Sequence, residues 1–133
     1  MTEDLLFVYG TLRRGSGHRM HDVLASGSSF VDRGVFQGRL FLVAHYPGAV
    51  ASDDSSARVI GDAFRLHDPD PILAKLDRYE RCDPKDPDSP YVRRVEFVTL
   101  DSGERVSAWI YLYNRNTEAL PLISSGDFLA DAH

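Results

Sequence analysis

The chain of 133 residues is 43% hydrophobic and 26% charged, which is typical of a globular protein, and its length suits one domain spanning 1–133. A formal net charge of -5, with no basic run longer than Arg13-Arg14 or Arg93-Arg94, argues against nucleic acid as a partner. The N-terminus has neither a leader pattern nor a membrane-spanning pattern and Cys82 is the single cysteine, so we expect a cytoplasmic protein without a membrane partner.

The N-terminal part of the chain combines one strand signal with one helix signal. The apolar run Leu5–Tyr9 stops at Gly10 and predicts a short buried strand. A polar loop over 10–17 follows. The spacing of apolar residues over about 18–25 predicts a short helix, and Gly27 stands where a glycine that ends a helix is expected.

The middle of the chain is rich in strand-forming residues. The segment Ser29–Val43 contains many Val, Phe and Leu residues and predicts a long or bent strand, in which Gly34 and Gly38 mark bulges or close backbone approach. The segment Arg58–Leu66 predicts another strand. Together these segments indicate a curved sheet.

The second half of the chain predicts one helix and one hairpin. The segment Asp68-Pro69-Asp70-Pro71 opens a helix that runs to about Glu80, because aspartate caps free N–H groups and proline suits the first turn. Strands over 91–100 and 105–113 form a hairpin, and the charged, proline-rich stretch 83–90 is typical of an exposed loop. The pattern favours an α+β fold, in which a small barrel-like or strongly curved, mostly antiparallel sheet packs against a helix.

Glu80 is the exceptional charged residue on the apolar side of this predicted helix. At about 100° per residue, with Ile72 taken as zero, Tyr79 falls at about -20°, Leu76 at about 40°, Glu80 at about 80° and Leu73 at about 100°. The other charged residues of the helix fall outside this arc. A carboxylate that faces the core is costly when ionised, so burial should raise its pKa toward the range that suits acid–base chemistry near neutral pH.

A second interpretation of Glu80 involves no chemistry. A charge at the edge of an apolar stripe is common at helix ends, where the side chain bends toward water or pairs with a cation. The candidate partners are Arg81, Arg93 and Arg94. Spacing alone favours this second interpretation and does not decide between the two.

The turn Tyr9-Gly10-Thr11-Leu12 follows the first predicted strand. A glycine at this point lets successive backbone N–H groups point toward one spot, which makes a nest for a carboxylate or a developing oxyanion. Arg13 and Arg14 would add positive charge nearby. On its own, so short a motif is more often a plain strand-to-loop turn, and it lacks the Gly-Lys-Ser/Thr of a phosphate-binding loop.

Three other groups of residues carry weaker signals. Cys82 has no identifiable histidine partner, so it is interpreted as a small buried or semi-exposed thiol rather than a nucleophile. His18 and His21 share a predicted helix face, but no third ligand completes a metal-binding pattern, so we expect no metal site. Trp109 lies in an aromatic-rich strand and is expected in the core.

Five short motifs occur together in a familiar order. They are VYGTLRRG (8–15), HYPGAV (45–50), LDRYE (76–80) followed by YVR (91–93), AWIYLY (108–113) and SGDF (125–128). Each motif is short, but their common order over nearly the whole chain resembles the γ-glutamylcyclotransferase-like family, which includes the AIG2-like proteins.

The resemblance implies a small β-barrel with flanking helices and a cavity at one end. It assigns proton transfer to Glu80 and substrate binding to the loop of Tyr9, Gly10, Thr11 and Leu12. Weaker candidates for the cavity wall, for which ordinary turn and core packing are the alternative, are Tyr46, Pro47, Gly48 and Tyr113. The implied partner is a small γ-glutamyl amide whose own α-amine attacks the γ-carbonyl, closes 5-oxoproline and expels the amine, without a metal or cofactor.

The chain departs from the family pattern in two places. The residue after the glutamate is often glycine in the family, whereas here it is Arg81, and the stretch 83–90 is acidic and contains prolines. These departures leave the identity of the γ-glutamyl substrate open. The alternative function, from a different class, is a non-catalytic module that binds a small molecule in the same pocket and uses Glu80 for recognition. The oligomeric state is not indicated.

Overall fold

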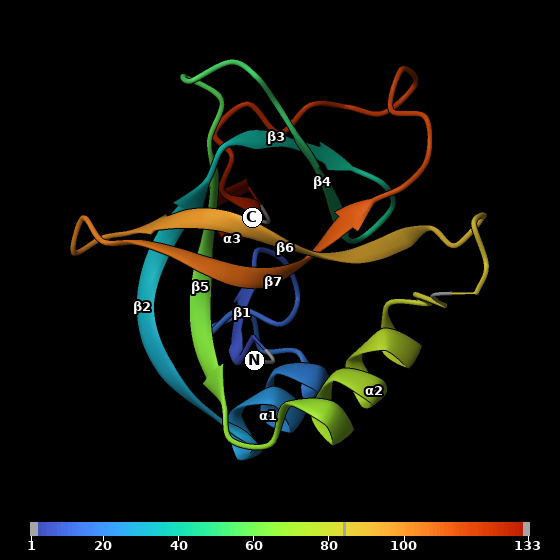
Figure 1. Ribbon diagram of the computed structural model, residues 1–133. Helices are drawn as coiled ribbons and strands as arrows, with labels where there is room; N and C mark the ends of the chain where they lie inside the picture. Colours follow the sequence, from blue (N-terminus) through green and yellow to red (C-terminus); the bar gives the residue numbers. More distant parts are fainter. Residues whose placement is uncertain (1–2, 84, 132–133) are drawn as a thin grey trace.

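The computed structural model describes residues 3–83 and 85–131, which form a closed five-stranded barrel, a separate two-stranded sheet and three helices (Figure 1). The strands are β1 (Leu5–Val8), β2 (Ser28–Phe36), β3 (Gly38–Leu42), β4 (Pro47–Ala51), β5 (Val59–Leu66), β6 (Tyr91–Leu100) and β7 (Arg105–Tyr113); the helices are α1 (Arg19–Ser26), α2 (Pro69–Tyr79) and α3 (Phe128–Asp131). The barrel order is β1-β5-β2-β6-β7, with parallel pairing between β1 and β7 and antiparallel pairing elsewhere. The predicted α+β fold, a mostly antiparallel barrel with flanking helices, is confirmed.

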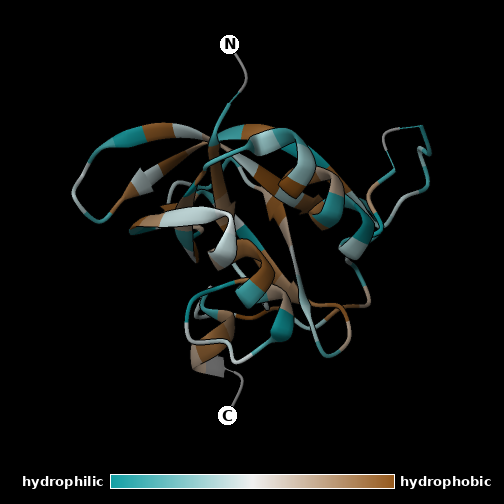
Figure 2. Ribbon diagram, turned by 90° about the horizontal axis from the view of Figure 1, so that it is seen from below, coloured by the Kyte–Doolittle hydropathy of each residue, from teal (hydrophilic) through white to brown (hydrophobic). Residues whose placement is uncertain are grey.

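β1 is buried on both faces, which explains its continuous apolar sequence. Successive side chains of a strand point to opposite faces. Leu5 and Phe7 belong to one apolar cluster, whereas Leu6 and Val8 belong to a second cluster that includes residues of α1 and α2. In Figure 2 the helices carry hydrophobic and hydrophilic residues side by side, as helices with one solvated face do. Packing on both sides fixes the end of β1, from which the turn at Gly10 departs.

The segment predicted as one strand over 29–43 forms two strands that belong to different sheets. β2 stays in the barrel, whereas β3 leaves it and pairs with β4, so the prediction of one continuous strand is wrong. The glycines do mark close backbone approach: a Cβ at Gly34 would lie 2.8 Å from the Thr99 carbonyl oxygen, and one at Gly38 would lie 2.4 Å from the Val50 carbonyl oxygen. β4 and α3 have no counterpart among the predicted elements.

The two longer helices are shaped by residues that the sequence singles out. His18 caps α1 and Gly27 ends it. A Cβ at Gly27 would lie 2.9 Å from the Cδ1 atom of Ile72 in α2, so a larger residue there would make the end of the Ile72 side chain shift. α2 buries its predicted apolar stripe, but Asp68 at its N-cap makes no side-chain capping bond, contrary to the predicted role of that aspartate.

The hairpin of β6 and β7 has the predicted bounds. Its residues pair from Tyr91 opposite Tyr113 to Thr99 opposite Arg105. Because β7 also pairs with β1, this hairpin closes the barrel. Within the part of the chain that the structure describes, no helix is long and apolar enough to cross a membrane.

Candidate active site

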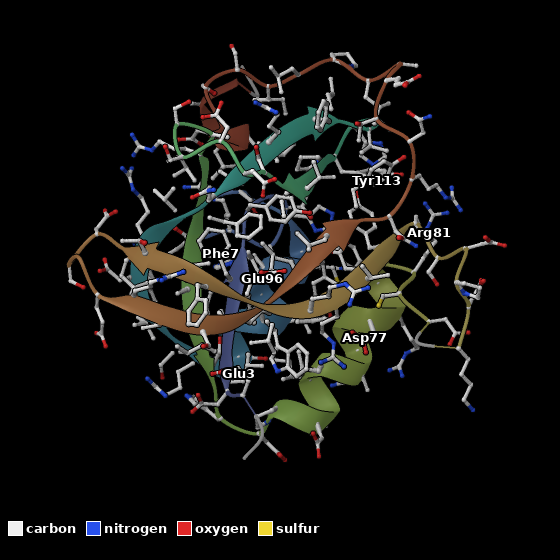
Figure 3. All side chains as sticks on the ribbon, turned by 45° about the horizontal axis from the view of Figure 1, so that its top comes forward. Glu3, Phe7, Asp77, Arg81, Glu96 and Tyr113 are labelled. Carbon is white, nitrogen blue, oxygen red and sulfur yellow. The ribbon has the colours of Figure 1, made fainter. Side chains whose placement is uncertain are left out.

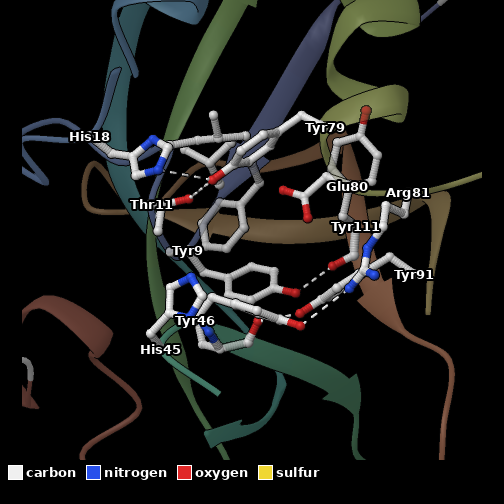
Figure 4. Close-up of a pocket in the computed structure, with 15 residues that line it drawn as sticks. Tyr9, Thr11, His18, His45, Tyr46, Tyr79, Glu80, Arg81, Tyr91 and Tyr111 are labelled. Atoms are coloured by element: carbon white, nitrogen blue, oxygen red, sulfur yellow. Dashed lines mark hydrogen bonds between the residues drawn. The ribbon is translucent and has the colours of Figure 1, made fainter. Parts of the chain in front are cut away.

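A cavity of about 230 Å³ lies where the end of β1, the end of α2 and the first residues of β4 and β6 meet (Figure 4). Ligand pockets commonly enclose about 300–1,000 Å³, so this cavity suits a small molecule rather than a large one. Seven of the residues proposed from the sequence line it: Tyr9, Gly10, Thr11, Leu12, Tyr46, Pro47 and Glu80.

Gly48 and Tyr113 are not among the residues that line the cavity. A Cβ at Gly48 would lie 2.8 Å from the Cβ of Tyr113, so the two residues are packed directly against each other. The Tyr113 ring also lies 5.6 Å from the ring of Tyr91, centroid to centroid, in an edge-to-face arrangement. Both residues therefore belong to a layer that packs behind the residues that line the cavity.

Among the described residues, eight that sequence reasoning did not assign to the cavity also line it: Phe7, Val8, His18, His45, Tyr79, Arg81, Tyr91 and Tyr111. Tyr79 and Arg81 flank Glu80 in the sequence, and this adjacency is a signal that points to them. The two tyrosines of β6 and β7 reach the cavity because the barrel closes, which no local pattern indicates.

The end of α2 places Glu80 through a specific capping motif. Glu80 is the C-cap of the helix, and its N–H donates to the Leu76 carbonyl at 2.8 Å. The Cys82 N–H then donates to the Asp77 carbonyl at 2.8 Å and the Arg81 N–H to the Arg78 carbonyl at 3.2 Å, which is the Schellman pattern. This motif turns the chain away from the helix directly after Glu80.

Arg81 occupies the position of this motif that is usually glycine. Its φ is 54°, in the left-handed region, which costs an L-residue about 1–2 kcal/mol. We expect Arg81→Gly to raise the free energy of unfolding by about 0.5–1 kcal/mol, less than the strain because glycine is also freer in the unfolded chain. Urea unfolding measures this change. Arg78→Gly, within α2, is the matched control and should lower stability; a loss of stability in both variants would contradict the strain at Arg81.

The Glu80 carboxylate is enclosed by the cavity, although the residue keeps some exposed surface at the helix end (Figure 4). Burial raises the pKa of Glu80 from 4.5 to about 7. The partial negative charge at the carboxyl end of a helix acts in the same direction. A carboxyl with this pKa exchanges its proton near neutral pH, as a general acid–base group must.

The arginines that the sequence offered as partners of Glu80 are engaged elsewhere or lie apart. Arg93 binds the carboxylate of Asp77 with two hydrogen bonds, from Nε at 2.8 Å and from Nη2 at 3.1 Å. Among residues 3–83 and 85–131, neither Arg81 nor Arg94 forms an ion pair with Glu80, and its carboxylate accepts no hydrogen bond. Asp77, expected to face solvent, is half-buried in its ion pair.

The turn after β1 offers backbone donors to the cavity. The N–H of Arg13 closes the turn onto the Gly10 carbonyl at 3.0 Å. The N–H groups of Gly10, Thr11 and Leu12 donate no hydrogen bond within the described residues. A Cβ at Gly10 would lie 2.9 Å from the Cγ of Pro47, so glycine lets the turn approach the opposite wall. Because Gly10, Thr11 and Leu12 line the cavity, their unused N–H groups are candidate donors to an anionic ligand group.

A polar chain runs from the turn to the end of α2. The hydroxyl groups of Thr11 and Tyr79 lie 2.7 Å apart, and Nε2 of His18 lies 3.4 Å from the Tyr79 hydroxyl. Because Nδ1 of His18 accepts the Met20 N–H, its Nε2 carries the proton in the neutral ring and donates to Tyr79. Either hydroxyl can be the donor in the bond between Tyr79 and Thr11, and this chain of hydrogen bonds connects two sides of the cavity.

Arg13 and Arg14 do not add charge to the cavity, in contrast to the expectation from the sequence. Arg13 is buried and pairs with Asp127 at 2.7 Å and with Asp62 at 3.6 Å. The side chain of Arg14 lies over the ring of Phe30, 3.7 Å from its centroid. The buried ion pairs tie the chain after the turn to β5 and to the segment before α3.

Buried tyrosines connect the strands around the cavity. The Tyr9 hydroxyl donates to the Tyr111 carbonyl at 2.5 Å and accepts the Ala49 N–H at 3.1 Å. The Tyr91 hydroxyl donates to the Pro47 carbonyl at 2.7 Å. Burial raises the pKa of both phenols far above the ordinary value, so they stay neutral. Tyr9 thus lines the cavity, while its hydroxyl is hydrogen-bonded to the backbone.

The remaining candidates from the sequence do not form a reactive centre. Cys82 is buried, and burial raises the pKa of its thiol, which disfavours the thiolate. His21 binds the Leu12 carbonyl through Nδ1 at 2.8 Å, whereas His18 caps α1. No cluster of three potential metal ligands occurs among the residues that the structure describes.

Comparisons with known proteins agree on one family. The family model for gamma-glutamyl cyclotransferase, AIG2-like, matches residues 6–130. The gamma-glutamylcyclotransferase family protein ytfP of Citrobacter rodentium is 33% identical over 126 residues, which cover 93% of this chain and 94% of that protein. An AIG2-like protein (GGACT) from mouse matches with a TM-score of 0.70 at 25% identity, covering 93% of this chain and 88% of the mouse chain. YkqA from Bacillus subtilis matches with a TM-score of 0.73 at 27% identity, covering 99% of this chain and 44% of YkqA.

Proposed function

The chain belongs to the AIG2-like gamma-glutamyl cyclotransferase family, and from this premise we propose that it releases an amine or amino acid from a small γ-glutamyl amide by cyclisation to 5-oxoproline. Glu80 is the general base and then the general acid of this reaction. The observation that carries the proposal is a carboxyl without a protein partner, with its pKa near 7, in a cavity that also holds the turn Gly10–Leu12 with its three unused N–H groups.

The reaction forms one C–N bond and breaks another. The carboxylate of Glu80 takes a proton from the substrate's α-ammonium group, and the freed amine attacks the γ-carbonyl carbon. The resulting oxyanion is stabilised by N–H groups of the turn Gly10–Leu12. As the oxyanion collapses, the bond to the leaving nitrogen breaks and protonated Glu80 returns the proton to that nitrogen. The ring nitrogen loses its second proton by the same route, so protons balance and no enzyme nucleophile is needed.

The cavity's main contribution in this proposal is to fold the substrate. An extended γ-glutamyl chain rarely brings its amine to its own γ-carbonyl, and holding the two groups together contributes about 7 kcal/mol or more in the best intramolecular cases. A small cavity with tyrosine walls tied to the backbone suits this task, because rigid walls restrict the substrate without moving themselves. A carboxyl with a pKa near 7 adds proton transfer in both directions.

Incubation of the protein with a panel of γ-glutamyl amines, γ-glutamyl amino acids and γ-glutamyl peptides tests the proposal. We expect 5-oxoproline and the free amine to form in equal amounts from at least one compound, measured by chromatography. Tight binding of these compounds without turnover would instead support the non-catalytic binding module. Heat-denatured protein is the control for spontaneous cyclisation.

A further inference from the structure

Among the described residues that line the cavity, Arg81 is the sole arginine or lysine. It comes directly after Glu80, so its side chain begins within one residue of the proposed acid–base group. Figure 3 places Arg81 just beyond α2, where the loop that follows begins, and Asp77 on the helix itself. A charged group that approaches Glu80 from this side therefore meets a cation first.

The guanidinium group of Arg81 forms no ion pair in the described ranges 3–83 and 85–131. Arg81 also lines the neighbouring surface groove, where Asp77, Asp83, Asp86 and Asp88 lie beyond ion-pair distance of it. Its side chain donates one long hydrogen bond, from Nη2 to the Tyr46 hydroxyl at 3.4 Å (Figure 4). The cation is thus held beside the cavity while its donors stay largely available.

The backbone at Arg81 points to the same conclusion. A residue with φ of 54° at the end of a Schellman motif is favourable as glycine and strained as arginine. Strain of this kind persists where the side chain serves a purpose other than folding. The side chain is exposed and forms no ion pair in the described part of the chain, so its purpose is not a structural ion pair.

We propose that Arg81 recognises a carboxylate on the leaving group of the substrate, so that the protein prefers γ-glutamyl-α-amino acids to γ-glutamyl amines without a carboxylate. This inference rests on the proposed function. Figure 4 shows the Glu80 carboxylate between the Thr11–Tyr79 pair on one side and the Arg81–Tyr46 pair on the other. With the glutamyl group held at the turn and the leaving nitrogen at Glu80, the remainder of the leaving group extends toward Arg81. Guanidinium binds a carboxylate through two parallel hydrogen bonds, which ammonium does not reproduce.

The sharpest test uses two substrates that differ by one carboxylate, γ-glutamyl-alanine and γ-glutamyl ethylamide. We expect the native protein to favour γ-glutamyl-alanine by about tenfold to a hundredfold in kcat/KM, the usual effect of a hydrogen-bonded charge. Arg81→Gln should reduce this ratio by at least about tenfold, and Arg81→Lys should retain part of it. Arg78→Gln, which removes an exposed cation outside the cavity in the last turn of α2, is the matched control and should keep the native ratio.

Two results would overturn the assignment. If the ratio of kcat/KM between the two substrates is unchanged in Arg81→Gln, Arg81 does not recognise the leaving group. If kcat/KM falls equally for both substrates, Arg81 binds the glutamyl carboxylate instead. Calorimetric binding of both compounds to Glu80→Gln, with and without Arg81→Gln, makes the test independent of turnover. If the native protein forms no 5-oxoproline, the proposed function fails, while a binding preference that disappears with Arg81 still supports this inference.

Discussion

Replacing Glu80 with glutamine is expected to lower kcat/KM for 5-oxoproline formation by about 10²–10⁴-fold, the usual contribution of a positioned acid–base group. Glutamine has nearly the same shape and keeps the end of α2 intact, but it neither accepts a proton from the α-ammonium group nor returns one to the leaving nitrogen. The measurement is the initial rate of 5-oxoproline release over a range of substrate concentrations. Binding of substrate should persist, because the walls and the turn remain.

The pH dependence adds a second readout of the same substitution. In the native protein kcat/KM should rise with pH through an apparent pKa of about 7, because the base form of Glu80 is required. The residual activity of Glu80→Gln should lack this step. Glu96→Gln, which changes a carboxylate outside the cavity, is the matched control and should retain both the rate and the step (Figure 3). Glu80→Gln activity within about twofold of native, far short of the general-base effect, would remove Glu80 from proton transfer.

Glu80→Gln is also expected to make the protein more stable at alkaline pH. Between pH 4.5 and about 7 the unfolded chain releases the Glu80 proton while the folded protein retains it. The unfolded state therefore binds fewer protons, and the stability of the native protein falls as pH rises through this window. Above this pH window, the raised pKa of Glu80 lowers the free energy of unfolding by about 3 kcal/mol. Glutamine carries no such cost.

Urea unfolding of both proteins at pH 5 and pH 8 measures this effect. The advantage of the glutamine variant should be small at pH 5 and reach about 3 kcal/mol at pH 8. Asp127, whose pKa is lowered chiefly by its hydrogen bond with Arg13 against the opposing effect of burial, gives stability the opposite slope at acidic pH, but it is common to both proteins and cancels in the difference. A difference between the variants that does not change with pH would show that Glu80 titrates normally.

The two expectations for Glu80→Gln support each other. A substitution that lowers turnover while stabilising the fold cannot lose activity through unfolding. A buried, unpaired carboxylate lowers the free energy of unfolding, and destabilising groups of this kind are concentrated at functional sites. Arg81 follows the same pattern on a smaller scale, because its left-handed backbone is strained and its side chain forms no ion pair in the described residues. Two adjacent residues that each oppose stability fit the roles proposed for them at the end of α2.

Local patterns predicted much of the fold. The apolar run of β1, the β6–β7 hairpin and the stripe of α2 were all predicted from periodicity, which depends on neighbouring residues alone. The division of segment 29–43 between two sheets was not predicted, because it depends on pairing with β4 and β5, which lie later in the chain. β4 itself is short and begins with proline and glycine, so it carries little strand signal.

Ordered motifs and helical spacing are properties of the chain alone, so they were enough to predict the family, the barrel and the position of Glu80 on the apolar side of a helix. The partners of the charges follow from tertiary packing instead: Arg93 binds Asp77 and leaves Glu80 unpaired, and Arg13 pairs with Asp62 and Asp127. Helical spacing gives an angle about an axis, but not which distant segment occupies the space at that angle. The pKa of Glu80 depends on that occupant: the closed barrel supplies tyrosine walls, and Arg81, which also lines the cavity, forms no ion pair with Glu80 in the described residues.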